Sequence, residues 1–219
     1  MILAIDTSVG TAVAVVENDG VVLAESSSEN SLGHAEVIGS LLQDVLAAAS
    51  GSSESNGETL AYVAAGMGPG PFTGLRVGIA AARAFALGRG IPVVPVASHD
   101  AVALEVFLAA ALTDSDAPRF AVVTDARRRE FAFTVYEGID DDGLPVRVTD
   151  PALSPRDELD ERLAALGAER RNAGAISAAM LGVVAGRAVS AGREIASTEP
   201  LYLRSPDVTL PHGPKRVTA

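Results

Sequence analysis

The chain has 219 residues, of which 48% are hydrophobic and 21% charged, a composition typical of a globular protein with a buried core. It contains no cysteine, which excludes disulfides, thiolate zinc sites and cysteine nucleophiles. Its formal net charge of −11 argues against nucleic-acid binding by this chain alone, because phosphate contacts need clustered Lys and Arg. The opening residues, MILAIDTS, carry no basic leader, and every apolar run is shorter than the roughly 20 residues of a membrane span. We therefore expect a soluble, cytoplasmic protein with no membrane partner.

The first half of the chain is predicted to begin with three strands and then to alternate helices and strands. Apolar runs flank Asn18-Asp19-Gly20, and an Asp-Gly pair between β-rich runs favours a hairpin. Farther on, apolar residues spaced by three and four indicate helices, and short apolar runs between them indicate strands. The expected elements are strands at 2–5, 11–16 and 21–23, a helix at 34–49, a polar linker at 50–58, a strand at 60–65, a helix ending near Gly88, a strand at 91–96 and a helix at 101–112.

The second half starts with the same order of elements. An apolar run at 120–125 ends in Asp125, and it is followed by a strand at 131–136, a turn at 140–143 and a strand at 146–148. One pattern used twice predicts an α/β protein with two lobes, each built on a mixed sheet. We assign residues 1–105 to an N-terminal lobe and residues 106–219 to a smaller C-terminal lobe with an extended tail.

The pattern weakens after residue 150. Residues 157–166 and 173–191 favour helices, and no clear strand lies between them. The proline-rich end of the chain favours an extended tail with one short strand at 201–203.

The stretch GMGPGPFTGLRVG, residues 66–78, is a glycine-rich loop between a strand and a helix. It lacks the lysine of a Walker loop and the third glycine of a dinucleotide fingerprint, so both phosphate patterns fail. Its first glycines, at 66, 68 and 70, can take positive φ, and the helix that follows could attract an anion, although a purely structural bend explains the loop equally well. Gly74, Gly78 and Ala82 lie four apart, which predicts an edge that another helix could approach closely.

Asp6-Thr7-Ser8, at the end of the first strand, is the other candidate for chemistry. A carboxylate here could hold a metal-bound phosphate or act in catalysis, or it could cap the bend that follows. The residues leave both interpretations open, and the same holds for Asp125 at the equivalent place in the second lobe. Asp6, Thr7 and Ser8 are candidates for a vestigial phosphate loop.

Histidines and arginines give weaker indications. His34, His99 and His212 stand alone, without the i, i+4 pair that would place two imidazoles on one helix face, so we expect no metal site. No Gly-x-Ser-x-Gly elbow is present, and no catalytic set can be assembled. The compact basic run at 127–129 is interpreted as a solvated turn.

Four stretches together resemble one known family: ILAIDTS, GMGPGPFTGLRVGIAAARAFALG, TDARRREFAFTVYE and PLYLRSPDVT. On these residues the chain is similar to the TsaB (YeaZ-like) family, dimerisation subunits of the bacterial machinery that makes threonylcarbamoyladenosine in tRNA. The resemblance spans most of the chain, and its Gly-x-Gly-Pro-Gly-x-Phe-Thr-Gly-x-Arg run is highly specific.

The resemblance implies the actin-like, sugar-kinase and heat-shock-chaperone fold, with two ribonuclease-H-like lobes. It also implies a non-catalytic subunit without a cofactor of its own, nucleotide being possible only in the complex. The implied partners are a TsaD-like paralogue that carries the metal and transfers the threonylcarbamoyl group, a TsaE-like ATPase, and a second copy of this chain in isolation, with tRNA met only through the complex. In the paralogue the first helix supplies two metal histidines at i and i+4, whereas here Ile38 follows His34.

The family's dimer contact runs through the first two helices, which correspond to residues 34–46 and 74–85. The interface residues that the resemblance implies are His34, Ile38, Leu41, Leu42, Val45, Phe72, Gly74, Leu75, Gly78 and Ala82. One departure concerns residues 167–177, which are too short and charged for the glycine-containing strand that the family has between its late helices. This leaves either a trimmed second lobe or residues absent from the sequence.

Two other classes of function remain open. An independent ATP-dependent kinase or ATPase would use Asp6 and the glycine loop around phosphate, although no adenosine-binding motif is readable in the second half. A metallopeptidase would need bound zinc or iron, and the missing histidine pair argues against it.

Overall fold

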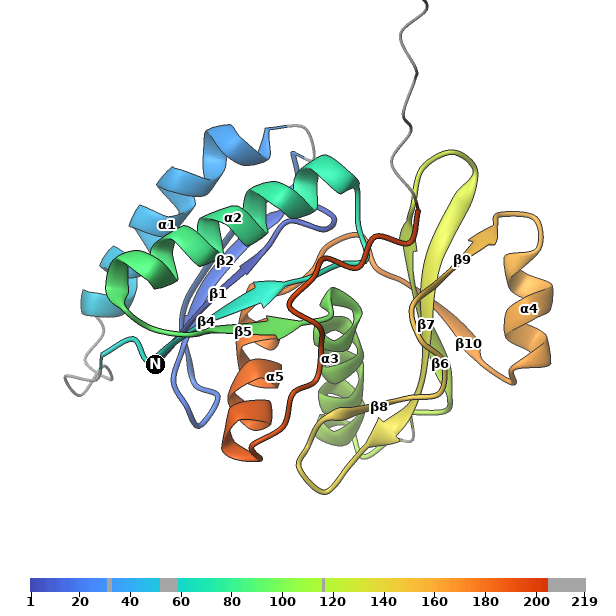
Figure 1. Cartoon of the computed structure of the whole chain (residues 1–219). Coiled ribbons are helices and arrows are strands. Elements are labelled where there is room, and N and C mark those ends of the chain that lie inside the picture. The colour runs from blue at the N-terminus through green and yellow to red at the C-terminus, as the bar shows by residue number, and fades with distance from the viewer. Residues whose placement is uncertain (31–32, 52–58, 116, 205–219) are drawn as a thin grey trace, which may run out of the picture.

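The computed structural model describes residues 1–30, 33–51, 59–115 and 117–204, which form two lobes, each built on a mixed β-sheet (Figure 1). The first sheet has the strand order β3-β2-β1-β4-β5. Strand β1 pairs antiparallel with β2 and parallel with β4, so its end lies beside the end of β4. The strands of this sheet are β1 (Ile2–Asp6), β2 (Thr11–Val16), β3 (Val22–Ser28), β4 (Tyr62–Gly66) and β5 (Val93–Val96).

Helices cover both faces of the first sheet. Helices α1 (His34–Gly51) and α2 (Phe72–Arg89) lie side by side on its outer face, and α3 (Ser98–Leu112) and α5 (Ala178–Ser190) lie on its inner face, between the lobes (Figure 1). Successive side chains of a strand point to opposite faces. Accordingly, Leu3 and Ile5 of β1 pack under α1 and α2, whereas Ile2 and Ala4 pack against the inner helices.

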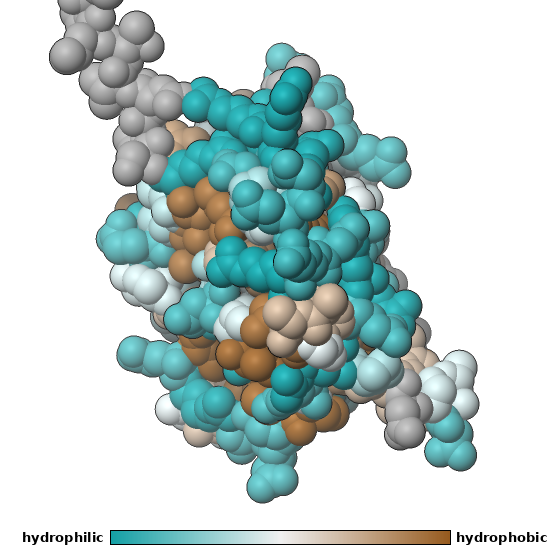
Figure 2. All heavy atoms as spheres, turned by 90° about the vertical axis from the view of Figure 1, so that its right-hand side faces the viewer, coloured by the Kyte–Doolittle hydropathy of each residue, from teal (hydrophilic) through white to brown (hydrophobic). Residues whose placement is uncertain are grey.

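The second sheet has the order β10-β6-β7-β8, with β9 paired to β7. Its inner face meets α3, and its outer face is covered in part by α4 (Leu159–Ala165). Figure 2 shows this outer face, which is largely hydrophilic with apolar patches between the polar side chains. The strands are β6 (Phe120–Asp125), β7 (Glu130–Ile139), β8 (Pro145–Arg147), β9 (Ala152–Pro155) and β10 (Glu169–Asn172).

The structure confirms the predicted order of elements in the first half and the three-strand start of the second half. It contradicts the prediction that no strand lies between the late helices, because β10 pairs parallel with β6 there. Its sequence, Glu-Arg-Arg-Asn, is largely exposed at the edge of the sheet, so the apolar pattern that identifies a strand is missing. Strand β9 is likewise absent from the predicted elements, and residues 201–203 are not a strand.

The two lobes do not follow a simple division of the sequence. Residue 105 falls inside α3, and α5, from the C-terminal part, packs on β1 and β2 of the first sheet. The parts of the chain that the structure describes contain no helix with the length and apolar character needed to span a bilayer. Most of the predicted linker at 50–58, His212 and the end of the tail lie outside the described residues.

Candidate functional site

The turn after β1 is buried and internally hydrogen-bonded. The carboxylate of Asp6 accepts hydrogen bonds from the amide of Ser8 (2.8 Å), from the Ser8 hydroxyl and from the hydroxyl of Ser98 (2.5 Å) at the start of α3. Asp6 is only 2% exposed. Burial raises the pKa of its carboxyl group, and the hydrogen bonds from the two serines partly oppose that rise. Asp6 therefore caps its own turn and ties β1 to α3, while a role toward phosphate stays a prediction.

The glycines of the 66–78 loop allow this turn to be packed closely. A Cβ on Gly66 would lie 1.9 Å from Asp6 Oδ2, and one on Gly70 would lie 2.7 Å from the Cα of Ser8. Of the three glycines predicted to use positive φ, only Gly68 does so, at 95°. Gly66 and Gly70 are glycines because of close approach and not because of their backbone angles.

The start of α2 packs against the same turn, through Gly74 and Gly78. A Cβ on Gly78 would lie 2.2 Å from Thr7 Oγ1, and one on Gly74 would lie 2.8 Å from the carbonyl oxygen of Thr7. The prediction that these glycines form an edge open to another helix is therefore wrong, because the chain's own β1–β2 turn already occupies it.

His34, at the start of α1, is buried with its Nδ1 atom 2.8 Å from Thr11 Oγ1. Ile38, one turn later, is 8% exposed and packs in the core under α1 and α2. Over the described ranges, no group of three or more His, Cys, Asp or Glu side chains is arranged to hold a metal ion.

A cavity of about 430 Å³ lies between the lobes, beside the glycine loop. One wall is formed by Pro69–Gly74 and His34, and the opposite wall by residues 124–128, which are the end of β6 and the turn that follows it. Asp125, the counterpart of Asp6, is exposed at the end of β6. Slight burial raises the pKa of its carboxyl group, but hydrogen bonds from Arg156 and from the amide of Arg127 outweigh that effect and lower the pKa. The two aspartates thus hold equivalent positions in very different surroundings.

Residues 197–204, which we name the C-terminal strap, cross from the first lobe to the second. The ring of Tyr202 stacks on Phe72 at the start of α2, with centroids 4.2 Å apart, and its hydroxyl accepts a 3.1 Å hydrogen bond from Arg76 Nε. The guanidinium of Arg76 also lies over the Phe72 ring, 3.8 Å from its centroid. Beyond Tyr202, Arg204 forms an ion pair with Glu130 of β7. No spacing or local pattern in the sequence indicates these contacts, although Phe72 and Tyr202 both belong to the motifs of the resemblance.

The structure places most of the ten implied interface residues inside the chain's own core. Leu42 and Phe72 are half-buried, and His34 is buried beside Thr11. The other seven are buried: Ile38, Leu41, Val45, Gly74, Leu75, Gly78 and Ala82. Apart from Phe72, which stacks on Tyr202, the half-buried apolar side chains on these helices are Val37, Leu42 and Leu46 of α1 and Val77, Ala81 and Phe85 of α2. We name these six residues the α1–α2 strip. Those of α2 recur every four residues and so form one line along the helix.

Comparison with known proteins gives one family and one fold. A family model described as TsaD, tRNA N6-adenosine threonylcarbamoyltransferase, matches residues 19–150. An uncharacterized protein of Mycobacterium tuberculosis (strain ATCC 25618 / H37Rv) is 37% identical over 217 residues, which cover 94% of this chain and 92% of that protein. The tRNA threonylcarbamoyladenosine biosynthesis protein TsaB of Escherichia coli (strain K12) is 34% identical over 145 residues, covering 65% of this chain and 57% of that protein.

Solved structures agree on the architecture. The chain matches YeaZ from Pseudomonas aeruginosa with a TM-score of 0.66 and 23% identity over 92% of this chain and 99% of that one. A crystal structure described as an uncharacterized protein with similarity to peptidase YEAZ, also from Pseudomonas aeruginosa, gives a TM-score of 0.67 over 93% and 99% of the two chains. The predicted actin-like fold with two mixed-sheet lobes is confirmed.

Proposed function

The chain belongs to the family described as TsaD, tRNA N6-adenosine threonylcarbamoyltransferase, within which it is TsaB-like, and from this premise we propose that it is a non-catalytic subunit of a complex that makes threonylcarbamoyladenosine in tRNA. In this role it pairs with a metal-bearing, TsaD-type paralogue and supports the activity of that paralogue. A TsaE-type ATPase joins the complex, nucleotide binds only there, and the isolated chain forms a homodimer.

The observation that carries the proposal is the environment of the first turn of α1. His34 is hydrogen-bonded to Thr11, and the position one turn later is filled by Ile38, whose side chain packs into the core. An aliphatic side chain buried there offers no metal ligand, and placing a histidine there would cost core packing. The first turn of α1 therefore contributes to packing and not to metal binding, which is consistent with a subunit whose partner carries out the transfer reaction.

The α1–α2 strip supports the pairing. Its side chains are half-buried although they belong to apolar residue types, and they lie along two adjacent helices on the outer face of the first sheet (Figure 1). Most of them pack in part against the chain's own core, and the apolar surface that stays accessible is suited to pack against the helices of a partner, where a few large side chains contribute most of the binding.

The test is assembly on a sizing column with light scattering. The purified chain mixed with its TsaD-type partner should elute as one complex, and Phe85→Asp in the strip should abolish co-elution while the variant stays folded. Leu87→Asp is the matched control, because Leu87 is on the same helix, is 84% exposed and lies outside the strip. If both wild-type proteins are folded and elute separately, the proposal is wrong.

The cavity beside the glycine loop favours one alternative, an ATP-dependent kinase or ATPase that acts alone. Against it, the Asp6 carboxylate is enclosed by hydrogen bonds from Ser8 and Ser98 and is not directed to an open phosphate position. Calorimetric titration with Mg-ATP separates the two functions, since tight binding with turnover by the isolated chain would favour the enzyme.

A further inference from the structure

The turn between β6 and β7 carries three consecutive arginines, Arg127, Arg128 and Arg129, which we name the arginine turn. All three have left-handed backbone angles, with φ of 62°, 49° and 62°. Residues other than glycine pay about 1–2 kcal/mol each for that conformation. The turn is nevertheless fixed, because the amide of Arg127 donates to Asp125 Oδ1 (2.7 Å) and the amide of Glu130 donates to the carbonyl of Arg127 (3.0 Å). Arginine thus occupies three positions where glycine would be less strained, which indicates that these side chains have a role.

The carboxylates that flank the arginine turn are already paired with arginines from elsewhere in the chain. Asp125 forms an ion pair of 2.7 Å with Arg156, which follows β9. On the other side, Glu130 pairs with Arg204 of the C-terminal strap. Five arginines therefore gather around these two carboxylates, in a chain whose net charge is −11. The region around the turn is therefore positively charged, although the protein as a whole is negatively charged.

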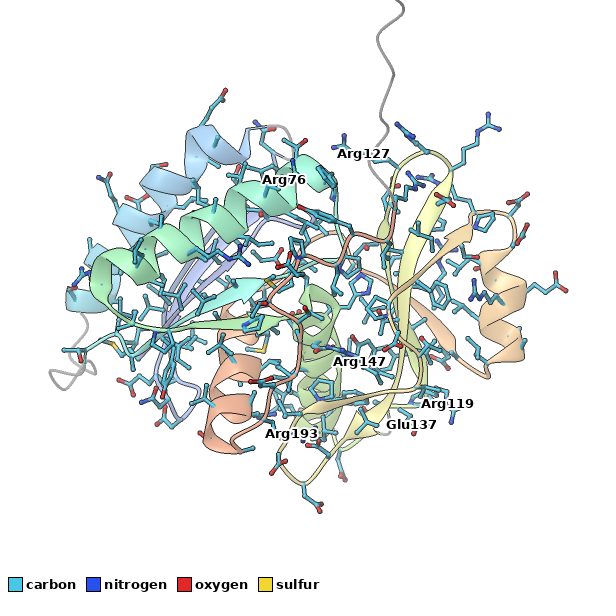
Figure 3. The ribbon with its side chains drawn as sticks, in the orientation of Figure 1. Arg76, Arg119, Arg127, Glu137, Arg147 and Arg193 are labelled. Carbon is cyan, nitrogen blue, oxygen red and sulfur yellow. The ribbon has the colours of Figure 1, made fainter. Side chains whose placement is uncertain are left out.

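The arginine turn also faces a second positive feature across the cavity. Arg127, Arg128 and Arg204 line one side, and Thr73 and Gly74 at the start of α2 line the other. Helix α2 begins after Pro71 without a side-chain cap, so its first amides add partial positive charge to that wall. Figure 3 shows Arg127 at the tip of the second lobe and Arg76 across from it, at the start of α2.

We propose that the arginine turn binds the phosphate backbone of tRNA when the chain is held in its complex, an inference that rests on the proposed function. Guanidinium groups bind phosphates through paired, charge-assisted hydrogen bonds. The side chains of the turn are exposed at an outer tip, which suits a row of backbone phosphates better than one enclosed ligand. The acidic remainder of the chain repels a polyanion, so the contact forms only when a partner brings the tRNA to it. Such contacts position the tRNA and read no sequence.

The decisive variant is Arg127→Gly with Arg129→Gly. Glycine removes two charges and also relieves two left-handed residues, so the folded state should be at least as stable as wild type. In the assembled complex, affinity for unmodified tRNA should fall about ten-fold or more at 0.1 M salt, and the slope of log K against log salt should weaken by about one for each phosphate that is no longer neutralised. The matched control is Arg119→Gln with Arg171→Gln, which removes equal charge; Arg119 lies at the opposite end of the lobe (Figure 3).

The four possible results differ in what they support. Lower tRNA affinity and a weaker salt slope for the glycine variant alone, with assembly on the sizing column intact, support the inference. Unchanged tRNA affinity, or an equal loss in the control, overturns it while leaving the proposed function in place. Pyrophosphate binding by calorimetry that is lost in the glycine variant, with tRNA affinity unchanged, assigns the turn to a small phosphate ligand and also overturns it. If the wild-type chain fails to assemble, both proposals fall.

Discussion

The hydroxyl of Thr7 accepts a 3.1 Å hydrogen bond from the amide of Gly78. The same hydroxyl donates to the carbonyl of Gly74 at 2.8 Å. In an α-helix, the amide of Gly78 and the carbonyl of Gly74 would bond to each other, because they are four residues apart. Thr7 therefore joins the β1–β2 turn to the first turns of α2 at a point where only glycine leaves room for the hydroxyl.

Gly78→Ala should destabilise the fold. A Cβ at this position would lie 2.2 Å from Thr7 Oγ1, and the helix backbone cannot move away without breaking both hydrogen bonds. We expect a loss of about 1–3 kcal/mol in the free energy of unfolding, and a larger loss for Gly78→Leu. Urea denaturation, monitored by circular dichroism, measures the change in the free energy of unfolding.

Two further variants serve as controls for Gly78. Gly39→Ala in α1 should be neutral or stabilising by up to about 1 kcal/mol, because no atom lies within 4 Å of the added Cβ and alanine is the better helix former. Adding Thr7→Ala to Gly78→Ala should recover part of the lost stability. Equal stability of Gly78→Ala and wild type would show that the close contact is not a constraint.

The glycine loop shows why sequence patterns predicted the elements better than the site. Alternating and three-four spacings of apolar residues were enough to predict most strands and helices, because burial on one face produces those patterns. A helix edge of small residues, by contrast, looks the same whether its neighbour is a partner or the chain's own turn. The neighbour of Gly78 is Thr7, which is 71 residues away, and no local pattern encodes that contact.

The late elements show a second limit of the same kind. Strand β10 is formed by polar and charged residues at a sheet edge, where pairing with β6 supplies the stability that apolar burial does not. Likewise, nothing in residues 197–204 indicates that Tyr202 meets Phe72. Both cases depend on pairing between distant segments and not on the local spacing of residues.

Tyr202→Ala should release the C-terminal strap from the first lobe. The substitution removes the stacked ring and the hydroxyl that accepts from Arg76, and an aromatic pair alone is worth about 0.5–1.5 kcal/mol beyond its buried area. Hydrogen exchange followed by mass spectrometry should show faster exchange of the Leu201 amide, which donates to the carbonyl of Met67. Tyr202→Phe keeps the stacking and should retain most of the protection. Equally slow exchange in the alanine variant would mean that other contacts hold the strap.

Arg147→Met should be strongly destabilising on its own and nearly harmless together with Asp100→Asn. Arg147 Nε donates to Asp100 Oδ1 at 2.8 Å, and the Tyr136 hydroxyl donates to the same oxygen at 2.7 Å. Removing only the arginine leaves a buried carboxylate without its cation, at a cost of about 3–5 kcal/mol. A double-mutant cycle in urea measures the coupling, and strictly additive costs would contradict this account of the pair.

The stability of the protein should fall in mild acid because of His99. Burial, and then the charge of Arg147, lower the pKa of His99 to about 3, and its two ring nitrogens lie 2.9 Å from the hydroxyls of Thr124 and Thr134. In the unfolded chain the imidazole has a pKa near 6.5, so between about pH 3 and pH 6.5 the unfolded state binds a proton at His99 and the folded state does not. The contribution of this group is therefore complete above about pH 6.5 and is lost, at about 1.4 kcal/mol per pH unit, as the pH falls toward 3.

His99→Gln isolates this effect, because glutamine can still bond to a threonine but does not titrate. Burial also raises the pKa of Asp6, which makes stability change with pH in the opposite direction just above the ordinary aspartate pKa. The comparison therefore uses the difference between variant and wild type, from urea denaturation between pH 5 and pH 6.5. The slope of unfolding free energy against pH should be smaller in His99→Gln by about 1.4 kcal/mol per unit near the lower end of this range. Parallel slopes for the two proteins would mean that His99 takes up its proton in the folded state over the same pH range as in the unfolded chain.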